Sequence, residues 1–149
     1  MIDQPIEVQT RIAAAPEVVF AYFVDPELYC RWKGTTAELD ARPGGLYRVL
    51  MPSGDRVRGE YVAVEPPHRV VFTWGFEGST DLPPGSSTVE ITLHADGDGT
   101  IVRLRHDRLP TDVSREQHAI GWRHYVERLA VVAAGGDPAT AGPTGTDGG

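Results

Sequence analysis

Residues 114–133 have the sequence SREQHAIGWRHYVERLAVVA and form the one long helical pattern of the chain. When this stretch is wound as a helix, one face collects His118, Gly121, Trp122, Tyr125 and Leu129. A series of short strand patterns comes before it. This order predicts an α+β fold in which a curved antiparallel sheet of about seven strands wraps around a long C-terminal helix.

The segments upstream of this helix supply the rest of that fold. Alternating apolar and polar residues predict a first strand over residues 6–12. Two short helical patterns follow, over residues 16–24 and 27–32, and Pro16 is well suited to a first helical position. Turns rich in Gly, Pro and Asp separate the later strand patterns, which cover residues 46–51, 56–65, 69–76, 88–95 and 100–107.

Composition indicates one domain and excludes several classes of protein. The chain has 149 residues, of which 40% are hydrophobic, so it can bury one core. We expect a domain over residues 1–134 and a disordered tail rich in Gly, Pro and Thr over residues 135–149. A net charge of −7 argues against a nucleic-acid partner, which would require a basic face. The lone Cys30 allows no intramolecular disulfide, and Lys33 is the only lysine among 14 basic residues.

The sequence also predicts a cytoplasmic protein. Residues 1–9 lack the basic start and apolar run of a signal peptide. No stretch approaches the length of apolar sequence that a membrane-spanning helix needs.

The strand patterns predict which side chains face the concave side of the sheet. Large aromatic rings with a few polar tips are typical of the lining of a small-molecule pocket. The alternative is that the same side chains form a dry core. The predicted inward set consists of Tyr47, Val49, Met51, Phe72, Trp74, Val89, Ile91, Leu93, Val102, Leu104 and His106.

Several short motifs, taken in order along residues 6–132, make the chain resemble a known superfamily. It is named for START, RHO-alpha-C, polyketide cyclase and Bet v allergen domains (SRPBCC). The most similar branch is named after the C-terminal domain of the activator of the heat-shock protein 90 ATPase. The motifs are PEVVF at 16–20, DPE at 25–27, RW at 31–32, PGG at 43–45, GEY at 59–61, EPP at 65–67, RVVFTW at 69–74, GT at 99–100 and GW at 121–122. The family often has a proline soon after the tryptophan, whereas here Trp32 is followed by Lys33, Gly34 and Thr35.

The resemblance implies a START-like helix-grip fold with a ligand cavity between the sheet and the C-terminal helix. The expected occupant is a hydrophobic or amphipathic small molecule. We expect the pocket to be lined by Trp32, Tyr47, Phe72, Trp74, Ile91, Leu104, His106, His118 and Trp122.

Motifs for catalysis, metals and cofactors are weak in this sequence. No H-x-H, H-E-x-x-H, C-x-x-C or G-x-S-x-G occurs, so we expect no metal, no cofactor and no nucleophilic elbow. Glu60 and His106 are the remaining polar candidates near a pocket, and a carboxylate in apolar surroundings could act as a general base. For Glu60 a surface position on its strand is the alternative. Gly121 followed by Trp122 indicates a close approach between helix and sheet.

Three functions remain open at this point. The first is a binding module for a hydrophobic small molecule, which the aromatic inward set favours. The second is an enzyme of the cyclase or hydrolase type that uses the same cavity, as the superfamily resemblance allows. The third is a co-chaperone that activates the heat-shock protein 90 ATPase. We expect no such activation, because the eukaryotic activators carry an additional N-terminal domain and only five residues precede the first predicted strand here.

Overall fold

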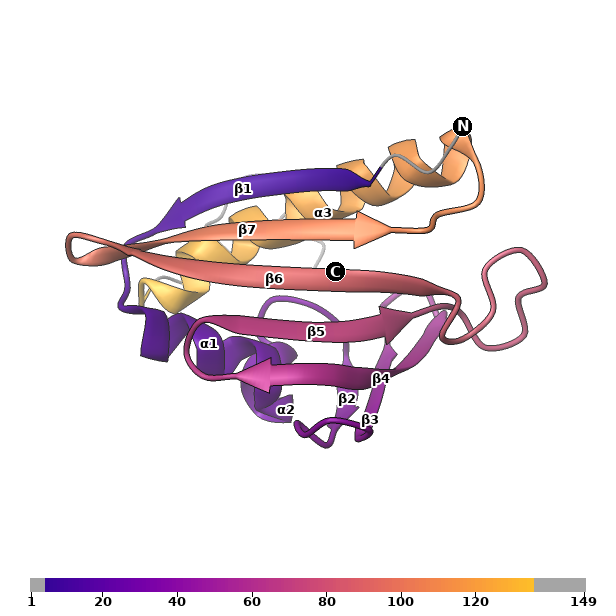
Figure 1. The fold of residues 1–149 in the computed structure, drawn as a ribbon, viewed down its shortest axis with the longest axis horizontal. Helices are drawn as coiled ribbons and strands as arrows, with labels where there is room; N and C mark the ends of the chain where they lie inside the picture. Colours follow the sequence, from indigo (N-terminus) through magenta and orange to yellow (C-terminus); the bar gives the residue numbers. More distant parts are fainter. Residues whose placement is uncertain (1–4, 136–149) are drawn as a thin grey trace.

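One antiparallel sheet organises the molecule. The computed structural model describes residues 5–135. The strand order across the sheet is β1-β7-β6-β5-β4-β3-β2, and Figure 1 shows the sheet curving in front of the helices. The strands are β1 (Ile6–Ile12), β2 (Thr36–Leu39), β3 (Leu46–Leu50), β4 (Arg56–Glu65), β5 (Arg69–Trp74), β6 (Ser87–Asp96) and β7 (Gly99–Asp107).

Three helices complete the helix-grip fold. They are α1 (Pro16–Val24), α2 (Pro26–Tyr29) and α3 (Asp112–Ala133). Helix α3 runs along the sheet, and α1 lies near its C-terminal end (Figure 1). The hydroxyl of Tyr22 on α1 donates to the carbonyl of Val132 on α3 across 3.5 Å. The predicted fold class is therefore confirmed.

The register of the strands turns the predicted inward set toward the core. Val89 pairs with His106, and Ile91 pairs with Leu104, so each pair points to the same face of the sheet. All members of the predicted set are buried except Met51, which is half-buried. Their polar neighbours along the same strands face outward. The prediction of which residues face inward is confirmed.

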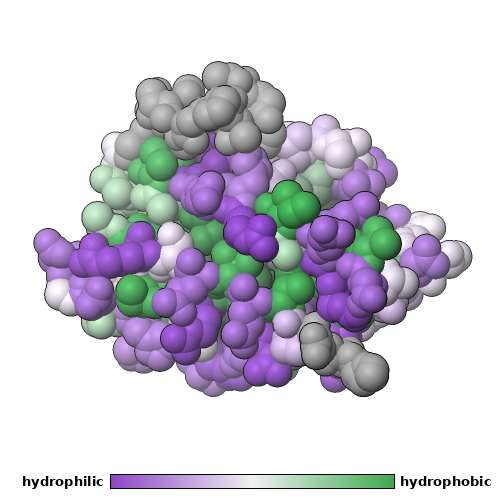
Figure 2. Space-filling view, turned by 90° about the horizontal axis from the view of Figure 1, so that it is seen from above, coloured by the Kyte–Doolittle hydropathy of each residue, from purple (hydrophilic) through white to green (hydrophobic). Residues whose placement is uncertain are grey.

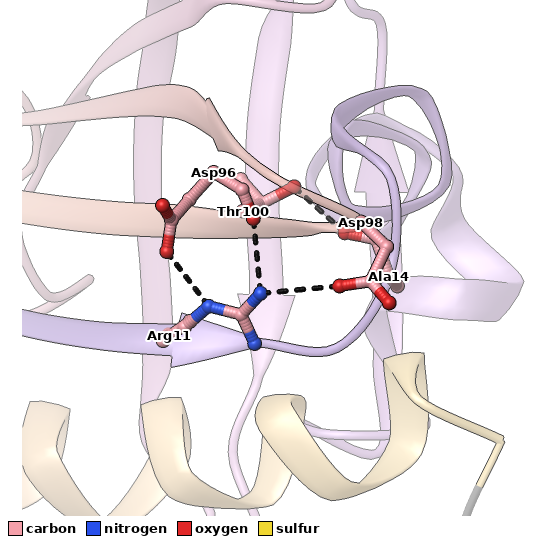
Figure 3. Close-up of polar contacts among 5 residues, drawn as sticks. All are labelled: Arg11, Ala14, Asp96, Asp98 and Thr100. Carbon is pink, nitrogen blue, oxygen red and sulfur yellow. Dashed lines mark hydrogen bonds and ion pairs between the residues drawn. The ribbon is translucent and has the colours of Figure 1, made fainter.

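A polar clamp ties β1 to the hairpin between β6 and β7 (Figure 3). Arg11 Nε donates to a carboxylate oxygen of Asp96 at 2.8 Å, and Arg11 Nη2 lies 3.3 Å from Asp98. Thr100 donates to the carbonyl of Ala14 at 2.7 Å. The side chain of Arg11 is largely exposed, so the clamp contributes less to stability than to the register of the edge strand.

Several local features differ from the predictions made from the sequence. The sequence patterns do not predict β2, because four residues that alternate between exposed and half-buried are too short a run to stand out. Helix α2 ends at Tyr29 rather than at residue 32, so Tyr29 is the buried residue of this helix. Strand β5 ends at Trp74, and Phe76 forms only an isolated bridge with Val57.

The start of α3 also differs. The helix begins at Asp112, and the Thr111 hydroxyl accepts from the Ser114 amide at 3.0 Å. Thr111 is therefore the N-cap, and Ser114, where the helical pattern of the sequence begins, already lies inside the first turn.

The surface is mixed in polarity. Figure 2 shows hydrophobic residues in a central group, surrounded by hydrophilic residues, on the face seen from above. Within residues 5–135, no helix is long and apolar enough to cross a membrane. Apart from Gly135, the predicted tail lies outside the described residues.

Candidate functional site

A cavity of about 360 Å³ lies between the sheet and the first half of α3. Three segments far apart in the sequence form its wall: the loop after α2, the turn between β3 and β4, and the end of β5. Helix α3 closes the remaining side. The lining residues are Lys33, Met51, Ser53, Asp55, Trp74, Phe76, Gln117, His118, Gly121, Trp122 and Tyr125.

Lys33 is the most unusual residue of this wall, because its side chain is buried with only 3% of the residue exposed. Its Nζ lies 4.3 Å from the ring centre of Tyr125 and 4.9 Å from those of Trp74 and Trp122. The closest polar atom recorded is Met51 Sδ at 3.4 Å. No carboxylate oxygen within the described part of the chain comes within 4.0 Å of Nζ.

Burial without a counter-charge changes the protonation of this amine. Because the cation loses its hydration, the pKa of Lys33 falls from 10.5 to about 7. Cation–π attraction from the three rings offsets part of this cost. Near neutral pH, Lys33 is therefore an amine that exists in both protonation states.

The backbone after α2 places Lys33 at this point. Its amide donates to the carbonyl of Tyr29 at 3.0 Å, which closes the turn that ends the helix. Gly34 follows with a φ of +89°, and a Cβ there would lie 2.5 Å from Val49 Cγ1. Only glycine meets both conditions. The dipeptide Lys33–Gly34 thus combines a buried amine with the chain reversal that positions it.

His106 lies behind the aromatic wall with a defined tautomer. The Ser87 hydroxyl donates to the Trp74 carbonyl at 2.9 Å, so it accepts from His106 Nε2 at 2.9 Å. His106 Nδ1 in turn accepts from Trp122 Nε1 at 3.0 Å. Burial, followed by the charges of His118 and Lys33, keeps the pKa of His106 well below 6.5. This neutral imidazole fixes the orientation of the Trp122 ring.

His118 and Trp74 each carry a polar atom for which no hydrogen-bond partner is recorded within residues 5–135. His118 Nδ1 donates to the carbonyl of Ser114 at 2.8 Å, so the other ring nitrogen, Nε2, carries the lone pair and can accept a hydrogen bond. No donor to Nε2 is recorded among residues 5–135. Burial lowers the pKa of His118, so this nitrogen is an acceptor at neutral pH. The indole N–H of Trp74 is buried and has no acceptor in the described structure. A buried polar atom without a hydrogen-bond partner, such as this indole N–H, is uncommon in native structures.

The structure divides the predicted lining residues into three groups. Trp74, His118 and Trp122 line the cavity. His106 lies behind them as their hydrogen-bond partner. The remaining five are buried in the core away from the cavity wall, namely Trp32, Tyr47, Phe72, Ile91 and Leu104.

Eight of the eleven lining residues are not among the predicted lining residues, and Lys33 and Gly121 are two of these eight. Lys33 was missed, although its position directly after Trp32 and its status as the only lysine were available signals. Gly121 was expected to allow close approach between helix and sheet. A Cβ at Gly121 would instead meet nothing within 4 Å, so the missing side chain leaves space in the cavity.

The other side chains considered for catalysis or metal binding do not form a site with the cavity within residues 5–135. Glu60 is exposed on β4, so it has the surface position that was the alternative. Residues 5–135 contain no group of three His, Cys, Asp or Glu side chains that could hold a metal ion. Cys30 is half-buried, and desolvation raises the pKa of its thiol, which disfavours the reactive thiolate.

The fold and cavity define a helix-grip domain, and comparisons with known proteins specify the family. The family model described as Activator of Hsp90 ATPase homolog 1-like protein matches residues 13–134. The chain therefore belongs to this AHSA1 family, within the SRPBCC superfamily. A comparison with curated proteins finds no match.

Solved structures agree with this assignment. An AHSA1-like protein from Rhizobium etli is 43% identical, with 91% of this chain and 85% of that chain covered and a TM-score of 0.74. CalU16 from Micromonospora echinospora is 27% identical over 96% of this chain and 71% of that chain, with a TM-score of 0.75. An HSP90 activator from Plasmodium falciparum is 25% identical over 86% of this chain and 94% of that chain, with a TM-score of 0.72.

Proposed function

We propose that this domain binds a hydrophobic or amphipathic small molecule in the cavity between the sheet and α3. The observation that carries the proposal is the cavity itself, about 360 Å³ in volume and walled by Trp74, Phe76, Trp122 and Tyr125. This volume lies within the range of roughly 300–1,000 Å³ that is usual for ligand sites. The unpaired indole N–H of Trp74 gives such a ligand a polar contact in addition to the apolar walls.

Binding is tested with hydrophobic fluorescent probes and with mass spectrometry of the natively purified protein. Trp74 and Trp122 both line the cavity, so their fluorescence should change on binding. Any bound ligand should also raise the melting temperature by mass action. Gly121→Leu places a side chain into the cavity and should abolish binding, whereas Gly121→Ala is the matched control, because one methyl group occupies little of the space. Retained binding in Gly121→Leu would place the ligand elsewhere and refute the proposal.

Removal of a wall residue gives a second test. Trp74→Ala should weaken any bound probe while the protein remains folded, because this ring has the cavity on one side and so fewer packing partners there. Circular dichroism checks the fold, and a probe titration checks the affinity. If Trp74→Ala unfolds the protein, Trp74→Phe is used instead, because it keeps most of the packing and removes only the indole N–H. This variant should still reduce the affinity for a ligand that carries a hydrogen-bond acceptor.

The second candidate is an enzyme of the cyclase or hydrolase type that uses the same cavity. The observation that favours it is an amine with a pKa of about 7 in the same wall as the neutral His118. Such groups can exchange protons with a bound substrate. The protein is incubated with a small molecule that it binds, and mass spectrometry then shows whether that molecule is chemically changed. A binding module would leave the molecule unchanged, whereas an enzyme would convert it to product. Turnover that Lys33→Met and His118→Gln both abolish would favour the enzyme.

The third candidate, a chaperone partner, is favoured by the similarity to the HSP90 activator from Plasmodium falciparum. The test is an ATPase assay with a purified heat-shock protein 90. We expect no stimulation, and a clear dose-dependent stimulation would place the chaperone role ahead of ligand binding.

A further inference from the structure

Within residues 5–135, Lys33 has a buried amine with neither a recorded counter-ion nor a recorded oxygen acceptor. Its recorded neighbours are the Met51 sulfur and three aromatic rings. A primary ammonium group has three N–H donors, and a thioether sulfur is a weak acceptor. An ammonium group buried in this way costs stability unless a partner of opposite charge compensates it. The partner is absent from the described chain, and Lys33 faces a cavity large enough for a ligand.

The other ionisable groups near the cavity do not provide that partner. Asp55 lines the cavity from the turn between β3 and β4, but its side chain is exposed and its recorded contact is with Ser53. His118 on α3 and His106 on β7 have lowered pKa values and are neutral at pH 7. Tyr125 on α3 presents its ring to Lys33. Near the buried end of the cavity the local charge is therefore positive or zero.

From this arrangement we infer that the ligand is an apolar molecule that carries one anionic oxygen group, such as a carboxylate or a sulfonate, and that Lys33 binds this group. The inference rests on the proposed function, because it requires a ligand in the same cavity. An oxyanion near Nζ would accept from the ammonium group and supply the missing counter-charge. The apolar remainder of the ligand would lie against Trp74, Phe76 and Trp122. The indole N–H of Trp74 is a second donor available to the same oxyanion.

The inference predicts that ligand binding and protonation of Lys33 are coupled. Only the ammonium form can pair with an anion, and in the free protein the pKa of Lys33 is about 7. Above that pH, binding of an anionic ligand requires Lys33 to take up a proton. The affinity for such a ligand should therefore fall by up to about tenfold per pH unit. A neutral ligand has no such requirement. Burial lowers the pKa values of His106 and His118 from the ordinary 6.5, so both imidazoles stay neutral above pH 7.

The test compares two fluorescent probes with the same aromatic skeleton. Anilinonaphthalene sulfonate carries an anionic sulfonate, which stays ionised across the pH range, and phenylnaphthylamine lacks it. Affinities are measured by titration at pH values from about 6 to about 9, on both sides of the Lys33 titration. The variants are Lys33→Met, which keeps the length and apolar character of the chain without the charge, and Arg103→Met, which removes an exposed cation on β7. Gly121→Leu shows whether each probe occupies the cavity.

We expect Lys33→Met to weaken the sulfonate probe by about tenfold or more, because a charge-assisted contact is lost. The neutral probe should change by less than about twofold, and Arg103→Met should leave both probes unchanged, since an exposed cation contributes little. The pH dependence of the sulfonate probe should disappear in Lys33→Met. The fold of this variant is checked by its melting temperature, which we expect to be equal to or above that of the wild type.

The remaining outcomes separate this inference from the function on which it rests. If both probes bind in the cavity and Lys33→Met affects them equally, or affects neither, the cavity is a ligand site without anion recognition and the inference is wrong. The inference also fails if the sulfonate affinity does not change with pH. If neither probe binds to the wild type, or Gly121→Leu displaces neither, the proposed binding function fails together with the inference.

Discussion

The two halves of α3 pack against the same sheet in different ways. Residues 126–133 form the dry half, in which Val126, Leu129 and Val132 are buried in the core. Residues 117–125 form the open half, which lines the cavity. Among the buried core residues next to the dry half, the Trp32 indole N–H donates to the Tyr22 carbonyl at 3.0 Å.

Around the open half, the Trp74 indole N–H and His118 Nε2 have no recorded hydrogen-bond partner within residues 5–135, and the Lys33 amine has only the Met51 sulfur at 3.4 Å. Arg128 is an exception in the dry half, because its Nη1 is buried without a partner in the described structure. The C-terminal half of α3 is therefore packed as core, whereas its N-terminal half borders the cavity. The N-terminal end keeps the features of a binding site, at the expense of packing and charge compensation.

The greatest loss of stability is expected when the ring of Trp122 is removed. Trp122→Ala should reduce the free energy of unfolding by about 3–5 kcal/mol, because it removes a buried aromatic side chain and leaves His106 Nδ1 without its donor. Chemical denaturation measures the loss. Trp122→Phe keeps a ring and should cost clearly less. A loss below about 1 kcal/mol for Trp122→Ala would show that α3 does not pack as described.

The buried amine of the open half should make stability depend on pH above neutrality. The folded-state pKa of Lys33, about 7, lies below the unfolded value of 10.5, so the unfolded state binds more protons between these values. The stability of the wild type relative to Lys33→Met should therefore rise by up to about 1.4 kcal/mol per pH unit across this window. Below pH 7 the difference should be constant and should favour Lys33→Met.

Denaturation of both proteins at several pH values checks this prediction. Arg103→Met is the control, because an exposed cation should give a curve parallel to that of the wild type. If the free energy of unfolding changes with pH in the same way for wild type and Lys33→Met, the Lys33 amine is exposed to water and the prediction is wrong.

The neutral imidazole of His106, behind the aromatic wall, should make the stability of the protein depend on pH below 6.5. This effect should be smaller than the effect of Lys33. The folded-state pKa of His106 lies well below its ordinary 6.5, so stability is fully present above 6.5 and falls as the pH decreases from there. His106→Asn can still accept from Trp122 and should reduce this dependence. His94→Asn, an exposed position on β6, is the control and should leave the acid curve unchanged. Equal acid curves for wild type and His106→Asn would show that His106 is not held neutral.

The smallest expected effect is a gain in stability at Gly121. A Cβ at this position meets nothing within 4 Å, so Gly121→Ala should stabilise the protein by about 0.5–1 kcal/mol through helix propensity. Gly59→Ala on β4 is the contrasting variant, since its Cβ would lie 2.0 Å from the Thr73 carbonyl oxygen and should destabilise. Thermal denaturation distinguishes the two signs. A loss of stability in Gly121→Ala would mean that helix and sheet are closer there than the structure shows.

Most of the fold could be predicted from the sequence because its strands have one buried face. Alternation in β1, β6 and β7 fixes which residues face the core, since a shift of one residue would expose the whole apolar set. The spacing of Trp122, Tyr125 and Leu129 likewise fixes the inner face of α3. The strand β2 escaped prediction because it is short and lies at the edge of the sheet, where neither face is fully buried.

The order of the elements, the inward-facing residues and the family resemblance can be predicted from the sequence, because they depend on local periodicity and on ordered short motifs. Which part of the concave side is filled and which part is open depends on three-dimensional packing. Trp32, Tyr47 and Trp74 have the same aromatic character in the sequence, yet Trp74 lines the cavity and the other two lie in the core. Lys33 becomes a candidate binding residue only because the turn at Gly34 brings its amine between rings from β5 and α3, which are distant in the chain. Burial and charge compensation depend on all neighbours in space, and one-dimensional spacing carries no record of them.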